Sequence, residues 1–190
     1  MTLNQVRRVV TGQSPDGKGM FTHVETVEPC ELNVNPNQVV DSMRYWAIWS
    51  WQETPTLPFH HSGAAPWSDK MRRDPGEALI VISEFAPKFG VEMTPQVVLE
   101  PSAEVTGTPD ENNISRGGIP DPRTAMHFSD TVDVWWVISG EITILSDDGA
   151  EVTIRQGDVL VENGARHSWE NRSDEPCVVG SISFGTFRRD

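Results

Sequence analysis

The chain has 190 residues, with 28 acidic residues against 15 basic ones and a formal net charge of -13 at pH 7. That charge repels phosphate backbones, which argues against nucleic acid as a partner. No window approaches the roughly 20 apolar residues of a membrane helix, and residues 1–12 lack the apolar run of a secretory signal. We therefore expect one cytoplasmic domain that does not enter a membrane.

Short β-rich segments recur between clusters of Gly, Pro, Asn and Asp, which predicts an all-β fold of the sandwich or barrel type. In chain order the expected strands span residues 6–10, 19–24, 44–52, 78–85, 97–100, 131–139, 141–145, 151–155, 158–162, 167–170 and 177–184. Gly149 follows two aspartates between two of these strands. It predicts a hairpin because glycine adopts the positive φ that tight hairpin loops need.

Two stretches between the strands hold few apolar residues, and both predict long loops. Residues 101–123 read as a loop or lid beside the compact C-terminal half. Residues 55–73 contain the pair His60 and His61, which would point to opposite faces of an extended segment and so rarely serve one site. We expect one domain overall, with residues 1–100 forming an extension and the first barrel strands and residues 124–187 forming the barrel core.

The segment at residues 44–52 carries apolar side chains at both parities. Trp46 shares a face with Ile48, and Trp49 and Trp51 share the other, so both faces are predicted to be apolar. Such a strand needs cover on two sides, which favours a homodimer. The alternative is a monomer in which residues 55–73 cover the second face.

Two cysteines, Cys30 and Cys177, are too few and too far apart for a disulfide framework or a cysteine zinc site. We interpret both as small buried or half-buried residues.

The residues that carry chemistry lie between positions 127 and 171. On an extended strand the side chains of His127, Ser129, Asp133, Trp135 and Val137 share one face. By the same alternation His167, Trp169 and Asn171 share a face, and a closed barrel turns such faces toward one interior.

Two imidazoles and one carboxylate on inward faces are the ligand set of non-haem iron and also suit zinc or manganese. Three structural interpretations stand beside this one. Each histidine can be a hydrogen-bonded core residue, Asp133 can pair with Arg166 or cap a turn, and the tryptophans can be core.

The region from Met126 to Asn171 resembles the cupin superfamily in its motif spacing. The first cupin motif contains His-x-His, a glutamate and a glycine, and this chain has His127, Ser129, Asp133 and Gly140 at those spacings. The second motif has a glycine, Pro-x-Gly-x-x-His and an asparagine; here Gly157, Gly164, His167 and Asn171 stand in that order, with Glu162 at the proline position and one residue fewer between Gly157 and that position. Ser129, Asp133 and Glu162 replace the usual His, Glu and Pro, and Asp121 replaces the first glycine. This variant looks like a subgroup of small cupins that also opens with Arg-Arg-Val-Val-Thr-Gly, here residues 7–12.

The resemblance implies a single antiparallel cupin barrel (jelly-roll) with an N-terminal β-rich extension, and a dimer. On this basis we expect a metal-dependent small-molecule enzyme in which His127, Asp133 and His167 bind one divalent ion, without distinguishing Fe, Mn, Zn or Ni. A substrate of the hydrophobic or aromatic carboxylic acid type would lie against an apolar wall, and the reaction would be dioxygenation, decarboxylation, hydration or isomerisation. The expected substrate-binding residues are Trp135, Val137, Trp169, Phe184 and Ser129.

Two alternatives remain open. One is a metal-free cupin in which His127 or His167 is the acid or base and Asp133 sets its tautomer. The other is a binding or sensing module without turnover.

Overall fold

The computed structural model describes residues 3, 5–33, 42–56, 74–91 and 126–188 of the chain. These residues form strands and loops and contain no helix, so none is long and apolar enough to cross a membrane. The strands are β1 (Val6–Gln13), β2 (Gly19–Val27), β3 (Cys30–Asn33), β4 (Ser42–Trp51), β5 (Ala78–Phe85), β6 (Thr131–Ser139), β7 (Glu141–Ser146), β8 (Glu151–Arg155), β9 (Val159–Asn163), β10 (His167–Glu170) and β11 (Cys177–Gly185).

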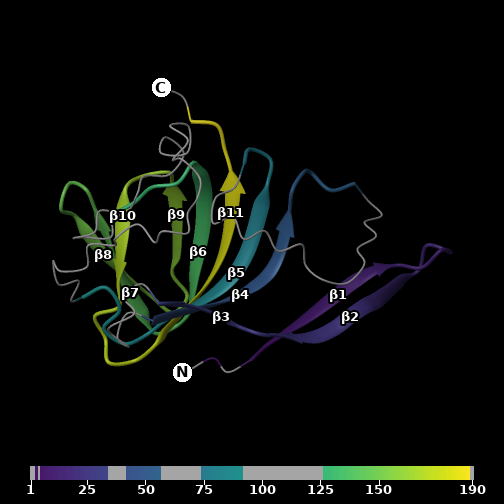
Figure 1. Ribbon diagram of the computed structural model, residues 1–190, viewed down its shortest axis with the longest axis horizontal. Helices are drawn as coiled ribbons and strands as arrows, with labels where there is room; N and C mark the ends of the chain where they lie inside the picture. The colour runs from purple at the N-terminus through teal and green to yellow at the C-terminus, as the bar shows by residue number, and fades with distance from the viewer. Residues whose placement is uncertain (1–2, 4, 34–41, 57–73, 92–125, 189–190) are drawn as a thin grey trace, which may run out of the picture.

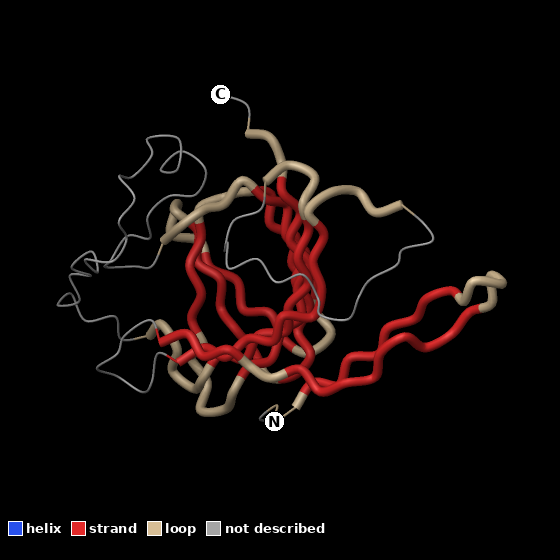
Figure 2. The backbone as a smooth tube through the Cα atoms, turned by 45° about the vertical axis from the view of Figure 1, so that its right-hand side comes forward, coloured by secondary structure: helices blue, strands red, loops and turns tan. Residues whose placement is uncertain are grey.

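Nine of these strands form a barrel of two sheets, and all their pairings are antiparallel. The larger sheet has the order β3-β4-β5-β11-β6-β9 and the smaller one the order β10-β7-β8. Seen end-on, the strands close around a common interior (Figure 2). The prediction of an all-β antiparallel barrel is confirmed.

The predicted strand positions agree closely with the structure. The bounds of β5, β6, β8 and β10 are those expected, and β1 and β2 are longer than expected. The predicted hairpin joins β7 to β8, with Gly149 at φ 80°. Strand β3 was missed, because its alternation of apolar and polar residues covers only four positions, too few to distinguish it from a loop. The expected strand at 97–100, the 101–123 loop and the His60-His61 pair lie outside the described residues.

The buried core lies between the two sheets, where β5, β6, β7, β8, β10 and β11 contribute side chains that pack together. Its members are Phe85, Val137, Ile142, Ile154, Trp169, Cys177 and Val179. Cys177 is fully buried as a free thiol, and this burial raises its pKa to about 12. The predicted buried placement of Cys177 is confirmed.

The prediction that the tryptophans of β4 lie on opposite faces is wrong. A β-bulge at Ile48 inserts one extra residue, so Trp46 pairs with Ile82 and Trp49 pairs with Ile80. Because Ile80 and Ile82 share a face of β5, both tryptophans lie on the outer face of the larger sheet. Arg44 lies over the Trp46 ring, which is fully buried, with 5.5 Å from its Cζ to the ring centroid.

Strands β1 and β2 form a separate two-stranded sheet that projects from the barrel as an arm (Figures 1 and 2). Near the barrel, Arg8 joins the arm to β4. It donates to the Ile48 carbonyl over 3.0 Å and pairs with Glu25 over 2.8 Å. The prediction of an N-terminal β-rich extension is confirmed by this arm.

Candidate active site in the barrel interior

One face of β6 supplies a row of polar groups to the interior. Asp133 is only 6% exposed, and its Oδ2 accepts a hydrogen bond of 2.8 Å from the Thr131 hydroxyl. The Thr131 hydroxyl lies 2.5 Å from that of Ser129, and Ser183 of the neighbouring strand β11 also hydrogen-bonds to Asp133. As predicted, Ser129 and Asp133 lie on one side of the strand, because alternate residues of an extended chain share a face.

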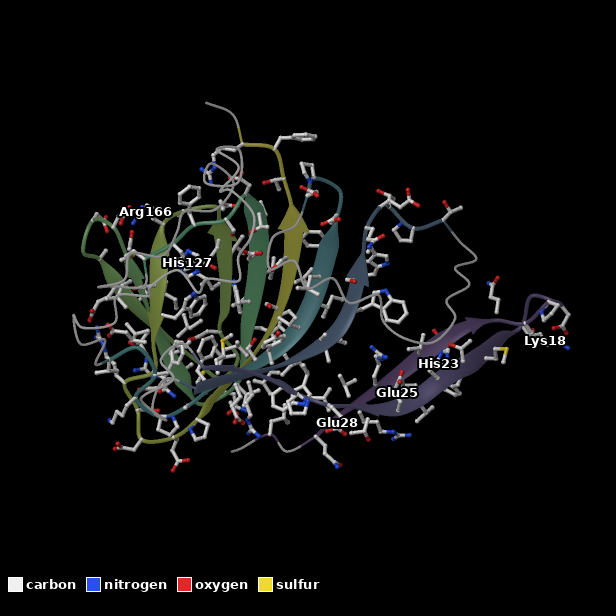
Figure 3. The ribbon with its side chains drawn as sticks, in the orientation of Figure 1. Lys18, His23, Glu25, Glu28, His127 and Arg166 are labelled. Atoms are coloured by element: carbon white, nitrogen blue, oxygen red, sulfur yellow. The ribbon has the colours of Figure 1, made fainter. Side chains whose placement is uncertain are left out.

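His127 and His167 meet where the two sheets of the barrel approach each other. Their backbones exchange two hydrogen bonds, of 3.0 Å and 2.9 Å, between the segment that leads into β6 and strand β10. Their rings lie 4.5 Å apart between centroids. In Figure 3 the labelled His127 lies within the outline of the barrel strands. The structure therefore brings together the two histidines predicted to share one site.

The structure adds a residue that the sequence interpretation missed, Glu162 of β9. It is 7% exposed and pairs with Asp133 in the β6–β9 register. Its Oε1 lies 3.0 Å from Nδ1 of His167. The cupin motif places proline at this position, so Glu162 counted only as a departure from the motif. The alternation of β9 was the available signal, because Val159 and Val161 turn outward and Glu162 therefore turns inward.

The tautomer of His167 follows from its two neighbours. Nδ1 lies 2.8 Å from the carbonyl oxygen of Ala165 as well as 3.0 Å from Glu162. A carbonyl oxygen only accepts, so this network assigns the proton of neutral His167 to Nδ1. The Nε2 atom then carries the lone pair, which is the arrangement of an oriented general base.

Two pKa values in this cluster are displaced. Burial, the largest cause, raises the pKa of Asp133, and the nearby charge of Glu162 adds to the rise, although hydroxyl donors from Ser183 and Thr131 oppose it. For His167, burial opposes the charged form. The hydrogen bond and charge of Glu162, with help from Ala165 and Asp133, outweigh that effect and raise the pKa of His167. The cluster therefore favours a protonated acid beside an imidazole that readily accepts a proton.

Aromatic rings line the same interior. Trp135 and Trp169 pack at 4.8 Å between centroids, Trp169 stacks on Phe85 at 6.0 Å, and His167 meets the edge of Trp169 at 5.9 Å. Val137 is also buried in this core. These side chains lie in the interior, and their role in binding a substrate stays a prediction.

Phe184 is the exception among the predicted wall residues, and its assignment is wrong. It is 44% exposed and follows Ser183, which turns inward to Asp133, so Phe184 points outward from β11.

The alternative in which Asp133 pairs with Arg166 is also wrong. Arg166 lies at the edge of the barrel, exposed, with its Nε 3.0 Å from Asp147 Oδ2 (Figure 3). Asp133 therefore has no arginine partner there, and a structural ion pair does not explain its burial.

On the inner face of the barrel wall, four buried polar atoms have no hydrogen-bond partner among the described residues: Asp133 Oδ1, Glu162 Oε2, Trp135 Nε1 and Ser181 Oγ. Buried polar groups are nearly always paired. Two of these atoms are acceptors, one is a donor and one is a hydroxyl, so together they suit a ligand with both donor and acceptor groups.

The predicted metal ligands share the interior but are not grouped as a coordination site. Among the described residues, no three His, Cys, Asp or Glu side chains are arranged to hold a metal ion. The Nδ1 atom of His167 is occupied by Ala165 and Glu162, and Asp133 Oδ2 is occupied by Thr131. Nε2 of His167 and Oδ1 of Asp133 remain open, but the described residues do not bring three such side chains together, so metal binding stays a prediction.

The comparison with known proteins matches the part of the chain that carries these site residues. Residues 118–183 match the family model of the cupin domain. A stretch of 54 residues is 37% identical to phomopsin biosynthesis cluster protein C' of Diaporthe leptostromiformis, covering 28% of this chain and 29% of that protein. The chain thus matches less than a third of that relative's length.

Two further relatives are named cupin-domain-containing oxidoreductases. virC of Hypocrea virens is 31% identical over 65 residues, 34% of each chain, and srdD of Neurospora crassa is 21% identical over 96% of this chain and 74% of its own. A solved structure, described as a predicted oxalate decarboxylase from Thermotoga maritima, aligns with a TM-score of 0.43 and 12% identity over 83% of this chain and 92% of that one. With this match over residues 118–183 and the antiparallel barrel that these residues help to form, the chain contains a cupin domain.

Proposed function

We propose that the barrel interior is the active site of a small-molecule enzyme that moves a proton, with His167 as the base and Asp133 as the acid. The observation that carries the proposal is the buried pair of Glu162 and His167, which fixes the proton on Nδ1 and leaves Nε2 free to accept another. A carboxylate that orients an imidazole and stabilises its charged form is a recurrent device of acid–base enzymes.

Each group has a defined part in the reaction. Nε2 of His167 takes a proton from a substrate carbon next to a carbonyl, and the charge of Glu162 stabilises the imidazolium that forms. Asp133, whose protonated form is favoured by burial, donates a hydrogen bond from that form to the substrate oxygen as negative charge develops there. Return of the proton to a different atom of the substrate completes an isomerisation with no change in oxidation state.

The interior selects a substrate with an apolar body. Trp135 and Trp169 supply the wall, and the indole Nε1 of Trp135 is available to donate a hydrogen bond. No lysine or arginine is buried among the described residues, whereas Asp133 and Glu162 both are. A substrate carboxylate, which the sequence suggested, would meet the buried carboxylate of Glu162, and no buried lysine or arginine among the described residues would balance it. We therefore propose a neutral aromatic carbonyl compound instead of a carboxylic acid.

The experiment incubates the protein in D₂O with a panel of neutral aromatic ketones and enones, each beside its carboxylic acid analogue, and follows deuterium in the compounds by mass spectrometry. Exchange is expected at carbons next to the carbonyl of the neutral compounds. His167→Ala should lower the exchange rate by roughly 10²- to 10⁴-fold, the usual contribution of a general base. Glu151→Gln, at an exposed ion pair, is the control and should leave the rate unchanged.

Three results would overturn the proposal. Binding without exchange would indicate a sensing module. A product whose oxidation state differs from that of the substrate would indicate an oxidoreductase, the class given in the names of two relatives. Exchange activity that is lost on chelation and restored by a divalent ion, with metal found in the protein by elemental analysis, would show that the reaction depends on a metal.

A further inference from the structure

The four buried polar atoms that lack a partner among the described residues fall into two pairs across neighbouring strands. In the β6–β9 register Asp133 lies opposite Glu162, and these residues contribute two carboxyl oxygens. In the β6–β11 register Trp135 lies opposite Ser181, and these residues contribute an indole N–H and a hydroxyl. The proton transfer proposed above uses the first pair. The second pair takes no part in it and needs a partner of its own.

Ser181 places a hydroxyl where its neighbours offer nothing polar. The residue is 1% exposed and turns inward, because it alternates along β11 with Val179 of the core and Ser183, which hydrogen-bonds to Asp133. Its register partner on β5 is Val81. A hydroxyl that is buried without a hydrogen bond lowers stability. The arrangement therefore indicates that a bound molecule supplies the missing partner.

Trp135 is held by ring packing and not by a hydrogen bond from its indole nitrogen. Its ring packs on Trp169 at 4.8 Å between centroids, and Trp169 stacks on Phe85. A buried indole N–H usually has a partner, but Nε1 of Trp135 has none within the described part of the chain. Residues directly opposite each other in an antiparallel pair have Cβ atoms about 4.5–5.5 Å apart. One ligand atom can therefore contact both Trp135 and Ser181.

From this pair we infer that Trp135 and Ser181 form a second polar subsite, which binds a hydroxyl group of the substrate. An indole N–H only donates, whereas a serine hydroxyl both donates and accepts. A substrate hydroxyl accepts from Nε1 of Trp135 and donates to Oγ of Ser181, so all three groups are paired. The inference rests on the proposed function, which places the substrate carbonyl at Asp133, and it narrows the substrate to a hydroxylated aromatic carbonyl compound.

The spacing of the two pairs gives the position of the hydroxyl on the substrate. Asp133 and Trp135 are two residues apart on β6, so the pairs are about 7 Å apart along the strand. A hydroxyl para to the carbonyl group lies across the full length of an aromatic ring, which suits this separation, whereas an ortho hydroxyl lies beside the carbonyl. The ring between the two oxygens would lie against Trp135 and Trp169.

The test is isothermal titration calorimetry of the full chain with acetophenone, para-hydroxyacetophenone and ortho-hydroxyacetophenone. The para isomer should bind at least about tenfold more tightly than acetophenone, because the unsubstituted ketone leaves two buried polar groups unpaired. The ortho isomer should gain much less. Ser181→Ala should abolish the preference for the para isomer while changing the Kd of acetophenone little. Trp135→Phe keeps an aromatic ring but removes Nε1, so it should reduce the same preference.

A matched control separates the subsite from a general effect of removing a buried hydroxyl. Ser168 is 3% exposed and alternates along β10 with His167 and Trp169, which turn inward, so its side chain faces away from the interior. Ser168→Ala should therefore keep the full preference. Without ligand, Ser181→Ala should melt no lower than the parent, because it removes a hydroxyl that has no partner.

Several outcomes overturn the inference. They are equal affinity for acetophenone and its para-hydroxy derivative, no binding of either, an equal gain for the ortho isomer, or a preference that survives in Ser181→Ala. Deuterium exchange into the same ketones is measured separately. Binding that depends on the hydroxyl but leads to no exchange supports the subsite and refutes the proposed reaction, whereas exchange that is indifferent to the hydroxyl refutes the subsite alone.

Discussion

Replacing Glu162 by Gln tests the central pair of the site through stability alone, without knowledge of the substrate. The side chains of His167 and Glu162 are 8% and 6% exposed and lie 3.0 Å apart. When His167 is charged, the variant leaves a buried imidazolium without its carboxylate, at a cost of roughly 3–5 kcal/mol. When His167 is neutral, only one neutral hydrogen bond is altered, worth about 1 kcal/mol.

The sign of the pH dependence follows from the raised pKa of His167. A raised folded-state pKa contributes stability that is fully present below the ordinary value of 6.5 and is lost as pH rises through the folded value. The parent therefore loses its advantage over Glu162→Gln as the solution becomes alkaline. The difference in unfolding free energy between them should be about 2–4 kcal/mol larger near pH 5.5 than near pH 9.

Urea denaturation followed by tryptophan fluorescence at the two pH values measures this difference. Glu151→Gln removes the carboxylate of an exposed pair with Arg172, so it should cost no more than about 1 kcal/mol and change little between the two pH values. A loss for Glu162→Gln that is equal at both pH values, or larger at the alkaline one, would refute the charged-pair reasoning.

Three further changes test other parts of the structure. Asp133→Asn removes a buried acid whose raised pKa makes its ionised form unfavourable in the folded protein. The melting temperature of the variant minus that of the parent should therefore increase as pH rises from about 4 to 8, and a decrease would contradict the raised pKa. Thr131→Val removes the hydroxyl that donates to Asp133 over 2.8 Å, which should raise the pKa of Asp133 further. The pH above which exchange activity is lost should then rise, and a pH limit that is unchanged or lower would exclude Asp133 as the acid. Gly180→Ala would place a Cβ 2.3 Å from the Trp136 indole and should cost about 1–3 kcal/mol in urea titration, whereas Gly19→Ala, with no neighbour within 4 Å, should stay within about 0.5 kcal/mol.

The sequence by itself determined most of the strands and the two histidine positions. Alternation along a strand has a period of two, so the inward placement of Asp133, Trp135 and Val137 could be read without a structure. Glycines between the predicted strands located the turns, because glycine adopts positive φ angles that few other residues do. Gly140, at φ 79°, is an example. Local rules were sufficient wherever the strand was regular.

Tertiary structure decided what local rules could not. The bulge at Ile48 shifted parity and put Trp46 and Trp49 on one face, and the outward turn of Phe184 depended on its pairing with β5 and β6. The partner of His167 came from β9, which pairs with β6 in the larger sheet. Arg166, considered as an alternative partner of Asp133, instead pairs with Asp147. Such contacts join residues that are distant in the sequence. They depend on the register of the paired strands, which is set when the whole barrel closes and cannot be read from one strand alone.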